Sequence, residues 1–125
     1  MPTILIVDDD PAIRQMLDLI FEQEGFTVFT APNGLKALHL PTLRAGQIDI
    51  VITDVMMPEM DGLAFTESLK RQQPHLPVLI LSACIEYLDI GSVSATQVMS
   101  KPFDVKALLH AVRCLLHKPV APAAA

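Results

Sequence analysis

Short apolar runs alternate along the chain with longer segments in which apolar residues recur every three or four positions. The short runs are rich in β-branched residues and show little polar alternation: TILIV (3–7), TVFT (27–30), IDIVIT (48–53), PVLIL (77–81) and TQVMS (96–100). Runs of this kind are typical of strands that are buried on both faces of a parallel sheet. The pattern therefore predicts a sheet built from these strands.

The segments between the runs have the period of a helix. The first predicted helix starts at Pro11 behind Asp10 as N-cap and ends before Gly25. A last helix is predicted over 104–117, with Asp104 in the N-cap position. The apolar positions of the two helices follow a helical repeat: Ile13, Met16, Leu17, Ile20 and Phe21 in the first, and Val105, Leu108, Leu109, Val112 and Leu116 in the last.

The middle of the chain gives weaker helical patterns. A helix over 34–45 contains Pro41, which should kink or end it near Leu40, and a helix over 62–73 has a thin apolar face. Between Ser82 and Thr96 the pattern fits a short helix around 85–88 or an ordered loop. Strands that alternate with helices predict an α/β fold, with a doubly wound, five-stranded parallel sheet and helices on both faces.

Length and composition predict a single globular domain, since the chain has 125 residues and 51% of them are hydrophobic. We expect the domain to cover 1–118, followed by an Ala/Pro-rich tail or linker over 119–125. A net charge of −5 without a Lys/Arg run argues against direct contact with nucleic acid. No charged leader and no apolar segment of membrane-spanning length is present, so we expect a cytoplasmic protein that does not contact a membrane.

Cysteines and histidines add no recognisable site motif. Cys84 and Cys114 lie far apart in the chain without CxxC spacing, and we expect both to be small buried apolar residues. The histidines lack HxxxH spacing and are predicted to lie at or near the surface: His39, His75, His110 and His117.

Polar side chains follow the apolar runs at the points where strands should end. Asp8 and Asp9 follow ILIV, Asp54 follows IVIT, Ser82 follows VLIL and Lys101 follows QVMS. In doubly wound sheets, ligands bind beyond the carboxyl ends of the strands, so these groups should meet at one edge. Asp10 is better explained as a helix cap.

Three carboxylates at one point repel each other, by roughly 3 kcal/mol for each pair about 5 Å apart at an effective dielectric of about 20. A small, hard cation such as Mg²⁺ would offset this repulsion and leave coordination positions for phosphate oxygens. A carboxylate beside the metal can attack phosphorus, with the metal, a lysine and a hydroxyl neutralising the phosphoryl oxygens. Asp54 is the central candidate for this role.

The chain resembles the receiver domain of two-component response regulators in four motifs, which occur in this order: VDDD (7–10), TDVMMPEMDG (53–62), LSA (81–83) and SKPF (100–103). The resemblance covers about residues 3–117 and implies a flavodoxin-like sheet with strand order 2-1-3-4-5. It implies that Asp54 is the phosphoacceptor, supplied by a histidine kinase or a histidine phosphotransfer protein. A downstream protein or a C-terminal output domain would read the signal.

The resemblance also implies the remaining site residues. Asp9, Asp54 and the backbone carbonyl of Met56 would bind Mg²⁺ directly, and Asp8 would act mostly through water. Ser82, Lys101 and the backbone amide of Ala83 would contact the phosphoryl group, and the bond between Lys101 and Pro102 would be cis. In this reading the protein is not an enzyme with a separate substrate, because it catalyses only its own aspartyl phosphorylation and dephosphorylation.

The sequence departs from the family's pattern in the region of its output face. Val98 stands where receivers commonly have Tyr or Phe, and the segment between Ser82 and Lys101 is shorter than usual. The family signals and dimerises through this face, so a homodimer is compatible with the sequence. Because of these departures, a receiver-like interaction module regulated independently of phosphorylation remains the alternative. A haloacid-dehalogenase-type phosphatase, suggested by Asp8-x-Asp10, would require later acidic pairs that the chain lacks.

Overall fold

The computed structural model describes residues 2–55, 60–82 and 97–117. The strands are β1 (Thr3–Val7), β2 (Thr27–Ala31), β3 (Ile50–Asp54), β4 (Val78–Ser82) and β5 (Gln97–Ser100). The helices are α1 (Pro11–Gln23), α2 (Gly34–Leu38), α3 (Pro41–Arg44), α4 (Gly62–Gln72) and α5 (Val105–His117). Helices therefore alternate with strands through most of the described chain.

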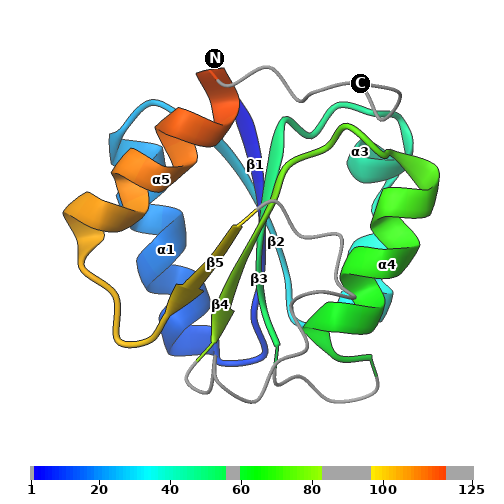
Figure 1. Ribbon diagram of the computed structural model, residues 1–125, viewed down its shortest axis with the longest axis horizontal. Coiled ribbons are helices and arrows are strands. Elements are labelled where there is room, and N and C mark those ends of the chain that lie inside the picture. The colour runs from blue at the N-terminus through cyan, green and yellow to red at the C-terminus, as the bar shows by residue number, and fades with distance from the viewer. Residues whose placement is uncertain (1, 56–59, 83–96, 118–125) are drawn as a thin grey trace.

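The strands form one parallel sheet in the order β2-β1-β3-β4-β5, which confirms the predicted flavodoxin-like arrangement (Figure 1). Successive residues of a strand point to opposite faces. Ile4 and Ile6 of β1 pack with α1 and α5, whereas Leu5 and Val7 pack with the other helices. Helices thus cover both sides of the sheet, and its central strands β1, β3 and β4 are buried on both faces, which explains their nearly uninterrupted apolar runs.

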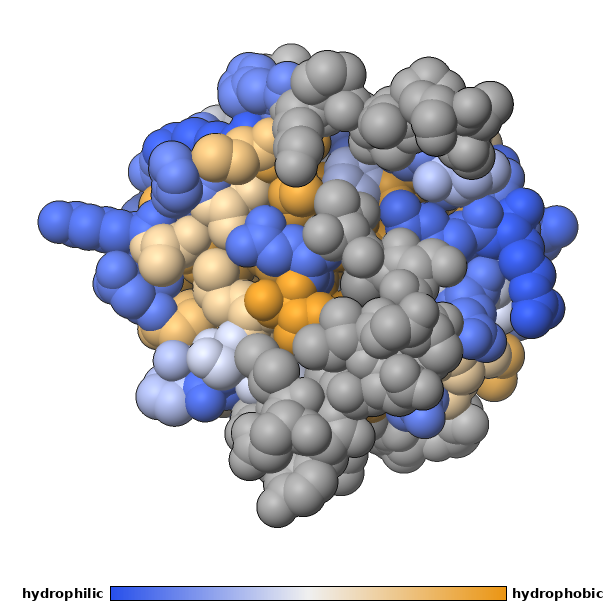
Figure 2. All heavy atoms as spheres, viewed as in Figure 1, coloured by the Kyte–Doolittle hydropathy of each residue, from blue (hydrophilic) through white to orange (hydrophobic). Residues whose placement is uncertain are grey.

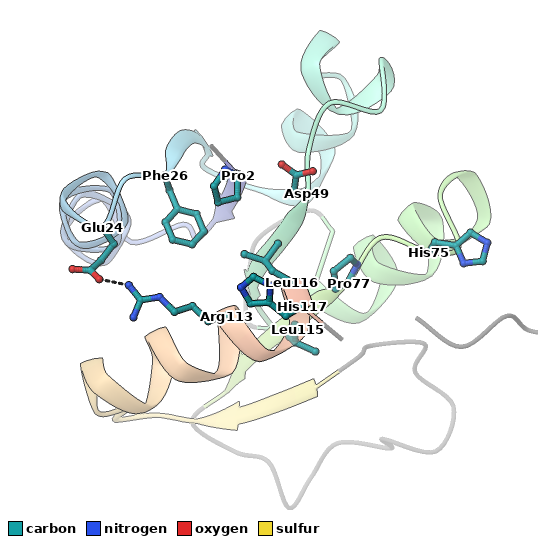
Figure 3. A pocket seen from close by; sticks show the side chains of 10 residues that line it. All are labelled: Pro2, Glu24, Phe26, Asp49, His75, Pro77, Arg113, Leu115, Leu116 and His117. Carbon is teal, nitrogen blue, oxygen red and sulfur yellow. Dashed lines mark hydrogen bonds and ion pairs between the residues drawn. The ribbon is translucent and has the colours of Figure 1, made fainter. Parts of the chain in front are cut away.

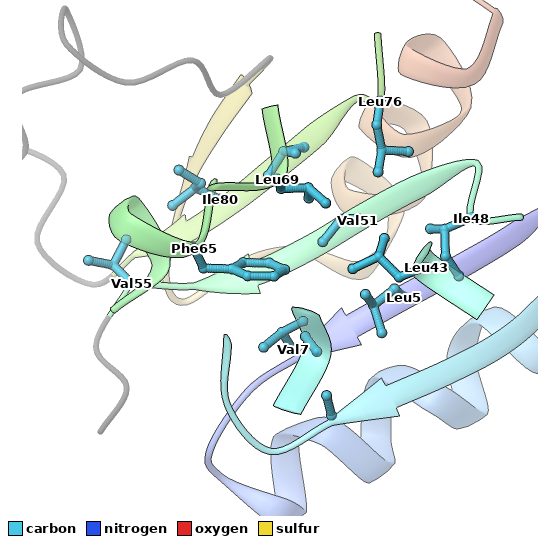
Figure 4. Close-up of a cluster of buried hydrophobic side chains, with 13 residues drawn as sticks. Leu5, Val7, Leu43, Ile48, Val51, Val55, Phe65, Leu69, Leu76 and Ile80 are labelled. Atoms are coloured by element: carbon cyan, nitrogen blue, oxygen red, sulfur yellow. The ribbon is translucent and has the colours of Figure 1, made fainter. Parts of the chain in front are cut away.

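The core on the side of α2, α3 and α4 is centred on Phe65 (Figure 4). Phe65 is fully buried and packs among the aliphatic side chains of β1, β3 and β4. Gly34 at the start of α2 lies against this ring, and a Cβ there would come within 2.9 Å of the Phe65 Cβ. A glycine at this position therefore allows α2 and α4 to pack closely.

The predicted helix caps and breaks are mostly confirmed. Asp10 caps α1 by accepting a hydrogen bond from the Ala12 amide, and Gly25 follows the helix with a φ of +90°. Pro41 does break the predicted 34–45 helix, because α2 ends at Leu38 and Pro41 begins α3 with Leu40 as its N-cap. The third strand begins at Ile50 rather than at 48, and it extends one residue further, to Asp54.

Cys114 was predicted to be buried, and this prediction was wrong because its side chain is exposed. The buried face of α5 consists of Leu108, Ala111, Val112 and Leu115. Position 114 lies off that face at the angular spacing of a helix. The predictions for Cys84 and for a short helix at 85–88 concern residues outside the described ranges.

The surface is polar with scattered apolar side chains. Figure 2 shows hydrophilic residues on the left and right of one face, with smaller hydrophobic areas between them. Four large apolar side chains of the described residues are exposed, and they are spread over three helices: Met16 and Leu19 on α1, Leu35 on α2 and Val105 on α5. Among the described residues, no helix combines the length and the apolar character needed to cross a bilayer.

Candidate functional site

Three carboxylates meet at the carboxyl edge of the sheet. Asp8 and Asp9 follow β1, and Asp54 is the last residue of the adjacent strand β3. One oxygen from each carboxylate lies within 4.8 Å of the other two. The structure therefore brings together the acidic residues that the sequence predicted, although Asp54 lies more than forty positions from the other two in the chain.

Asp8 is the buried member of this cluster, with 1% of its surface exposed. Its Oδ1 accepts a hydrogen bond of 2.9 Å from the Asp10 amide. Its backbone carbonyl accepts a hydrogen bond of 2.8 Å from the guanidinium of Arg14 on α1. These contacts fix the turn between β1 and α1 and orient the carboxylate, whereas Asp9 is exposed on the same turn.

Lys101 forms ion pairs with two of the three carboxylates. Its Nζ lies 3.5 Å from Asp8 Oδ2 and 3.3 Å from Asp54 Oδ2. The lysine follows edge strand β5, and its amide donates to the Ser82 carbonyl at 2.8 Å. The peptide bond between Lys101 and Pro102 is cis, as the family resemblance implied.

Burial raises the pKa of the Asp8 carboxyl above its ordinary value. The Asp10 amide and the Lys101 ammonium act in the opposite direction, and the negative charges of Asp54 and Asp9 raise the pKa further. Desolvation and charge crowding thus outweigh the stabilising contacts. One lysine does not fully balance this cluster, and a cation among the three carboxylates would favour their ionised forms.

The donor set fits Mg²⁺. All three groups offer hard carboxylate oxygens, the ligands that Mg²⁺ prefers. Neighbouring oxygens bound at 2.0–2.1 Å in an octahedron lie about 3 Å apart. The three carboxylate oxygens, which lie within 4.8 Å of one another, would therefore move closer together to bind one ion directly, or one of them would bind it through water.

Three hydrogen bonds that the sequence analysis did not identify fix the end of β3. The Val55 amide donates to Asp54 Oδ1 at 2.7 Å, and the Thr53 hydroxyl donates to the Asp54 carbonyl at 2.9 Å. Gly62 begins α4, and its amide donates to the Val55 carbonyl at 2.9 Å. The Asp-Gly pair at 61–62 was a usable signal, since Asp61 caps α4 by accepting from the Ala64 amide.

Ser82 ends β4 and is buried, with 2% of its surface exposed. It follows Leu81, which pairs with Asp54 in the register of β3 and β4. The sheet thus brings Ser82 to the same edge as Asp54.

Val98, on β5, is partly buried and packs against the core around Phe65. Met56 and Ala83, the two residues predicted to contribute backbone groups, lie outside the described ranges.

A family model described as the response regulator receiver domain matches residues 4–113. Together with the fold and the acidic edge, this match shows that the chain belongs to the receiver domain family of response regulators. The phosphorylation-independent interaction module is therefore the less favoured of the two functions considered from sequence. Signalling through two-component systems is the function of this class.

Individual relatives agree with this assignment. The "DNA-binding dual master transcriptional regulator RpaA" of Synechocystis is 36% identical over 126 residues, covering 94% of this chain and 50% of that protein. The transcriptional regulatory protein GlrR of Escherichia coli is 38% identical over 114 residues, covering 87% of this chain and 25% of that protein. The chain thus spans half or less of the length of these relatives.

Solved structures give the same result. The response regulator TrrA of Thermotoga maritima, in complex with Mg²⁺-BeF, superposes with a TM-score of 0.84 at 33% identity, covering 92% of this chain and 99% of that one. A response regulator receiver domain protein from Clostridium thermocellum superposes with a TM-score of 0.85 at 28% identity, covering 93% and 94% of the two chains.

Proposed function

We propose that this domain accepts a phosphoryl group on Asp54 from a phosphohistidine of a histidine kinase or phosphotransfer protein. The observation that carries the proposal is the position of Lys101 Nζ, which lies 3.3 Å from Asp54 Oδ2 and 3.5 Å from Asp8 Oδ2 within the acidic cluster. An ammonium beside the accepting carboxylate can stabilise the negative charge of a transferred phosphoryl group.

In this proposal an Asp54 carboxylate oxygen attacks the phosphorus of the donor. A new bond forms between that oxygen and phosphorus, the bond between phosphorus and the donor imidazole nitrogen breaks, and the imidazole leaves with the electron pair. The Val55 amide holds Asp54 Oδ1 at 2.7 Å, so the carboxylate is oriented before the donor arrives. Asp54 Oδ2, the oxygen that faces Lys101, is the proposed nucleophile.

Mg²⁺ is the proposed cofactor, and when bound it would neutralise negative charge on the transferred group. Asp9 and Asp54 would bind it directly, with the Met56 carbonyl as a further predicted ligand, while Asp8 would act through water. Support comes from the three clustered carboxylates and from the Mg²⁺-BeF complex of TrrA. Ser82 and the Ala83 amide are proposed to contact the phosphoryl oxygens.

The proposed receiver domain covers 1–118, and 119–125 would be a linker or tail. Its output would be a downstream protein or a C-terminal domain, since the curated relatives are about twice as long as this chain or longer. With a net charge of −5, the domain itself would not contact DNA, and any such contact would fall to another part of a longer protein. The site is proposed to work in the cytoplasm, with no substrate other than the phosphodonor.

Intact-mass measurement after incubation with Mg²⁺ and acetyl phosphate tests this function without a kinase. We expect a gain of one phosphoryl group in the wild-type chain, and none in Asp54→Asn or without Mg²⁺. Asp49→Asn is a matched control, because Asp49 precedes β3 at the opposite end of the sheet. Phosphorylation of Asp54→Asn to the wild-type level would refute the assignment of the acceptor.

A further inference from the structure

The turn between β1 and α1 carries two of the three clustered carboxylates, and the side chain of Arg14 holds its backbone. A guanidinium nitrogen of Arg14 donates to the Asp8 carbonyl at 2.8 Å. The Asp8 amide donates to the Ala31 carbonyl of β2 at 3.2 Å, and Asp8 Oδ1 accepts from the Asp10 amide. These last two contacts use backbone groups of the neighbouring residues. The Arg14 contact, by contrast, can be removed by a substitution that alters no carboxylate.

The carbonyl that Arg14 holds belongs to the peptide unit between Asp8 and Asp9. Because a peptide unit is planar, the direction of its carbonyl also fixes where the Asp9 amide and Cα lie. Asp9 is exposed, and among the described residues no hydrogen bond or ion pair involves its carboxylate. The position of the Asp9 carboxylate therefore depends on the backbone that Arg14 holds.

The charge of Arg14 has a different effect from its hydrogen bond. Within the described part of the chain, the ion pairs of the acidic cluster are made by Lys101 and not by Arg14. A positive charge near a cation site opposes binding of the cation. Loss of the Arg14 charge alone would therefore strengthen Mg²⁺ binding, whereas loss of the hydrogen bond would weaken it by freeing the turn. The two effects have opposite signs and can be told apart.

Mg²⁺ is sensitive to the position of its ligands, since it requires a nearly ideal octahedron of oxygens at 2.0–2.1 Å. We propose that Arg14 is a positioning residue for Mg²⁺ binding, which acts through the peptide unit between Asp8 and Asp9 and not through its charge. This inference rests on the proposed Mg²⁺ site, and it adds to that site a residue that binds no metal itself.

Arg113 offers a matched control because it contacts α1 at the other end of the helix. Its guanidinium forms an ion pair with Glu24, which follows the last residue of α1, and Figure 3 shows it directed at that carboxylate. The pair lies in a pocket that is also lined by Pro2 and Pro77, the residues before β1 and β4. Arg113→Met thus removes the same charge and a contact to the same helix, at the edge of the sheet opposite the carboxylates.

Isothermal titration calorimetry of the unphosphorylated chain measures the Kd for Mg²⁺ in each variant. We expect Arg14→Met to raise this Kd about tenfold, because loss of an outer contact that orients a metal ligand typically costs at least that much. Arg14→Lys retains a donor and should recover part of the loss, and Arg113→Met should bind as the wild-type chain does. The Mg²⁺ concentration that gives half the maximal rate of phosphorylation by acetyl phosphate should rise with the Kd. The maximal rate should change much less.

Arg14→Ala is a second variant that favours the helix and should show the same loss, and far-ultraviolet circular dichroism checks that each variant is folded. If Arg14→Met and Arg14→Ala bind Mg²⁺ as tightly as Arg113→Met, or more tightly, the inference is overturned. Equal weakening in Arg14→Met and Arg113→Met would also overturn it, because the cause would then be a loosened α1. Both outcomes leave the proposed function intact. A wild-type chain that binds no Mg²⁺ would instead overturn the proposed site, and the inference with it.

Discussion

Replacement of Gly62 by alanine should disturb the acidic site through the backbone alone. A Cβ at this position would lie 2.1 Å from the Asp54 carbonyl oxygen. It would also lie 2.9 Å from both the Asp54 carbonyl carbon and the Val55 Cα. Carbon atoms in favourable contact are about 3.5–4.0 Å apart, so either the end of β3 or the start of α4 must move by roughly 1 Å.

The energetic cost follows from this overlap. Insertion of a methyl group into closely packed structure typically costs about 1–3 kcal/mol, and the higher helix propensity of alanine offsets less than about 1 kcal/mol of it. We expect Gly62→Ala to destabilise the domain by about 1–3 kcal/mol, which lowers its Tm by roughly 4–12 °C. Because the displaced backbone carries Asp54, the rate of phosphorylation should fall by about tenfold or more.

Urea denaturation and the initial rate of phosphorylation by acetyl phosphate measure the two effects separately. Gly46→Ala is the control, because Gly46 has a φ of +72° and a Cβ there would meet nothing within 4 Å. It should lose about 1 kcal/mol of stability through backbone strain, with no change in phosphorylation rate. If Gly62→Ala keeps the wild-type rate, or if both variants lose rate equally, the steric argument is refuted.

Three further outcomes are expected. Lys101→Ala leaves the buried Asp8 carboxylate facing Asp54 without its cation, so the free energy of unfolding in urea without Mg²⁺ should fall by about 2 kcal/mol; an unchanged value would contradict the role of the ion pair. Mg²⁺ at about 100 times its Kd should stabilise the wild-type chain by about 2.7 kcal/mol, and Tm should be insensitive to Mg²⁺ if the cluster does not bind it. In the receiver domains that this chain resembles, the residues two positions after the phosphoacceptor and two positions after the serine tune hydrolysis of the acyl phosphate. Here these residues are Met56 and Cys84, which offer no acid or amide, so the phosphorylated chain should lose its phosphate slowly; a lifetime of only seconds, followed by intact mass, would contradict this.

The centre of the sheet could be predicted from sequence because strands β1, β3 and β4 are buried on both faces. That burial makes runs such as ILIV and VLIL apolar at every position, and the helices between them carry clear caps such as Asp10. The clustering of Asp8, Asp9 and Asp54 followed from one rule, that the carboxyl ends of parallel strands meet at one edge. Neither result required knowledge of side-chain contacts.

The contacts that orient the site could not be predicted in the same way. The hydrogen bond that the Arg14 guanidinium donates to the Asp8 carbonyl depends on the angle between β1 and α1. No sequence pattern encodes that angle. The approach of Gly62 to Asp54 likewise depends on where α4 begins relative to β3. The exposure of Cys114 could have been found, since its position lies off the apolar repeat of α5.

Side chains alternate between the two faces of the sheet along each strand, so in β1 and β3 the even-numbered residues point to one face and the odd-numbered residues to the other. Even-numbered Ile4, Ile6 and Ile52 contact the helical layer of α1 and α5, while odd-numbered Leu5 and Val51 contact the opposite layer. A single-residue insertion or deletion within a central strand would exchange the two sets for the rest of that strand and turn its remaining side chains toward the wrong layer. Insertions and deletions are therefore compatible with this architecture only between its strands. Apolar substitutions within a strand leave each side chain on the same face of the sheet. Variation in this domain should consequently be frequent in identity and rare in length wherever the sheet is formed.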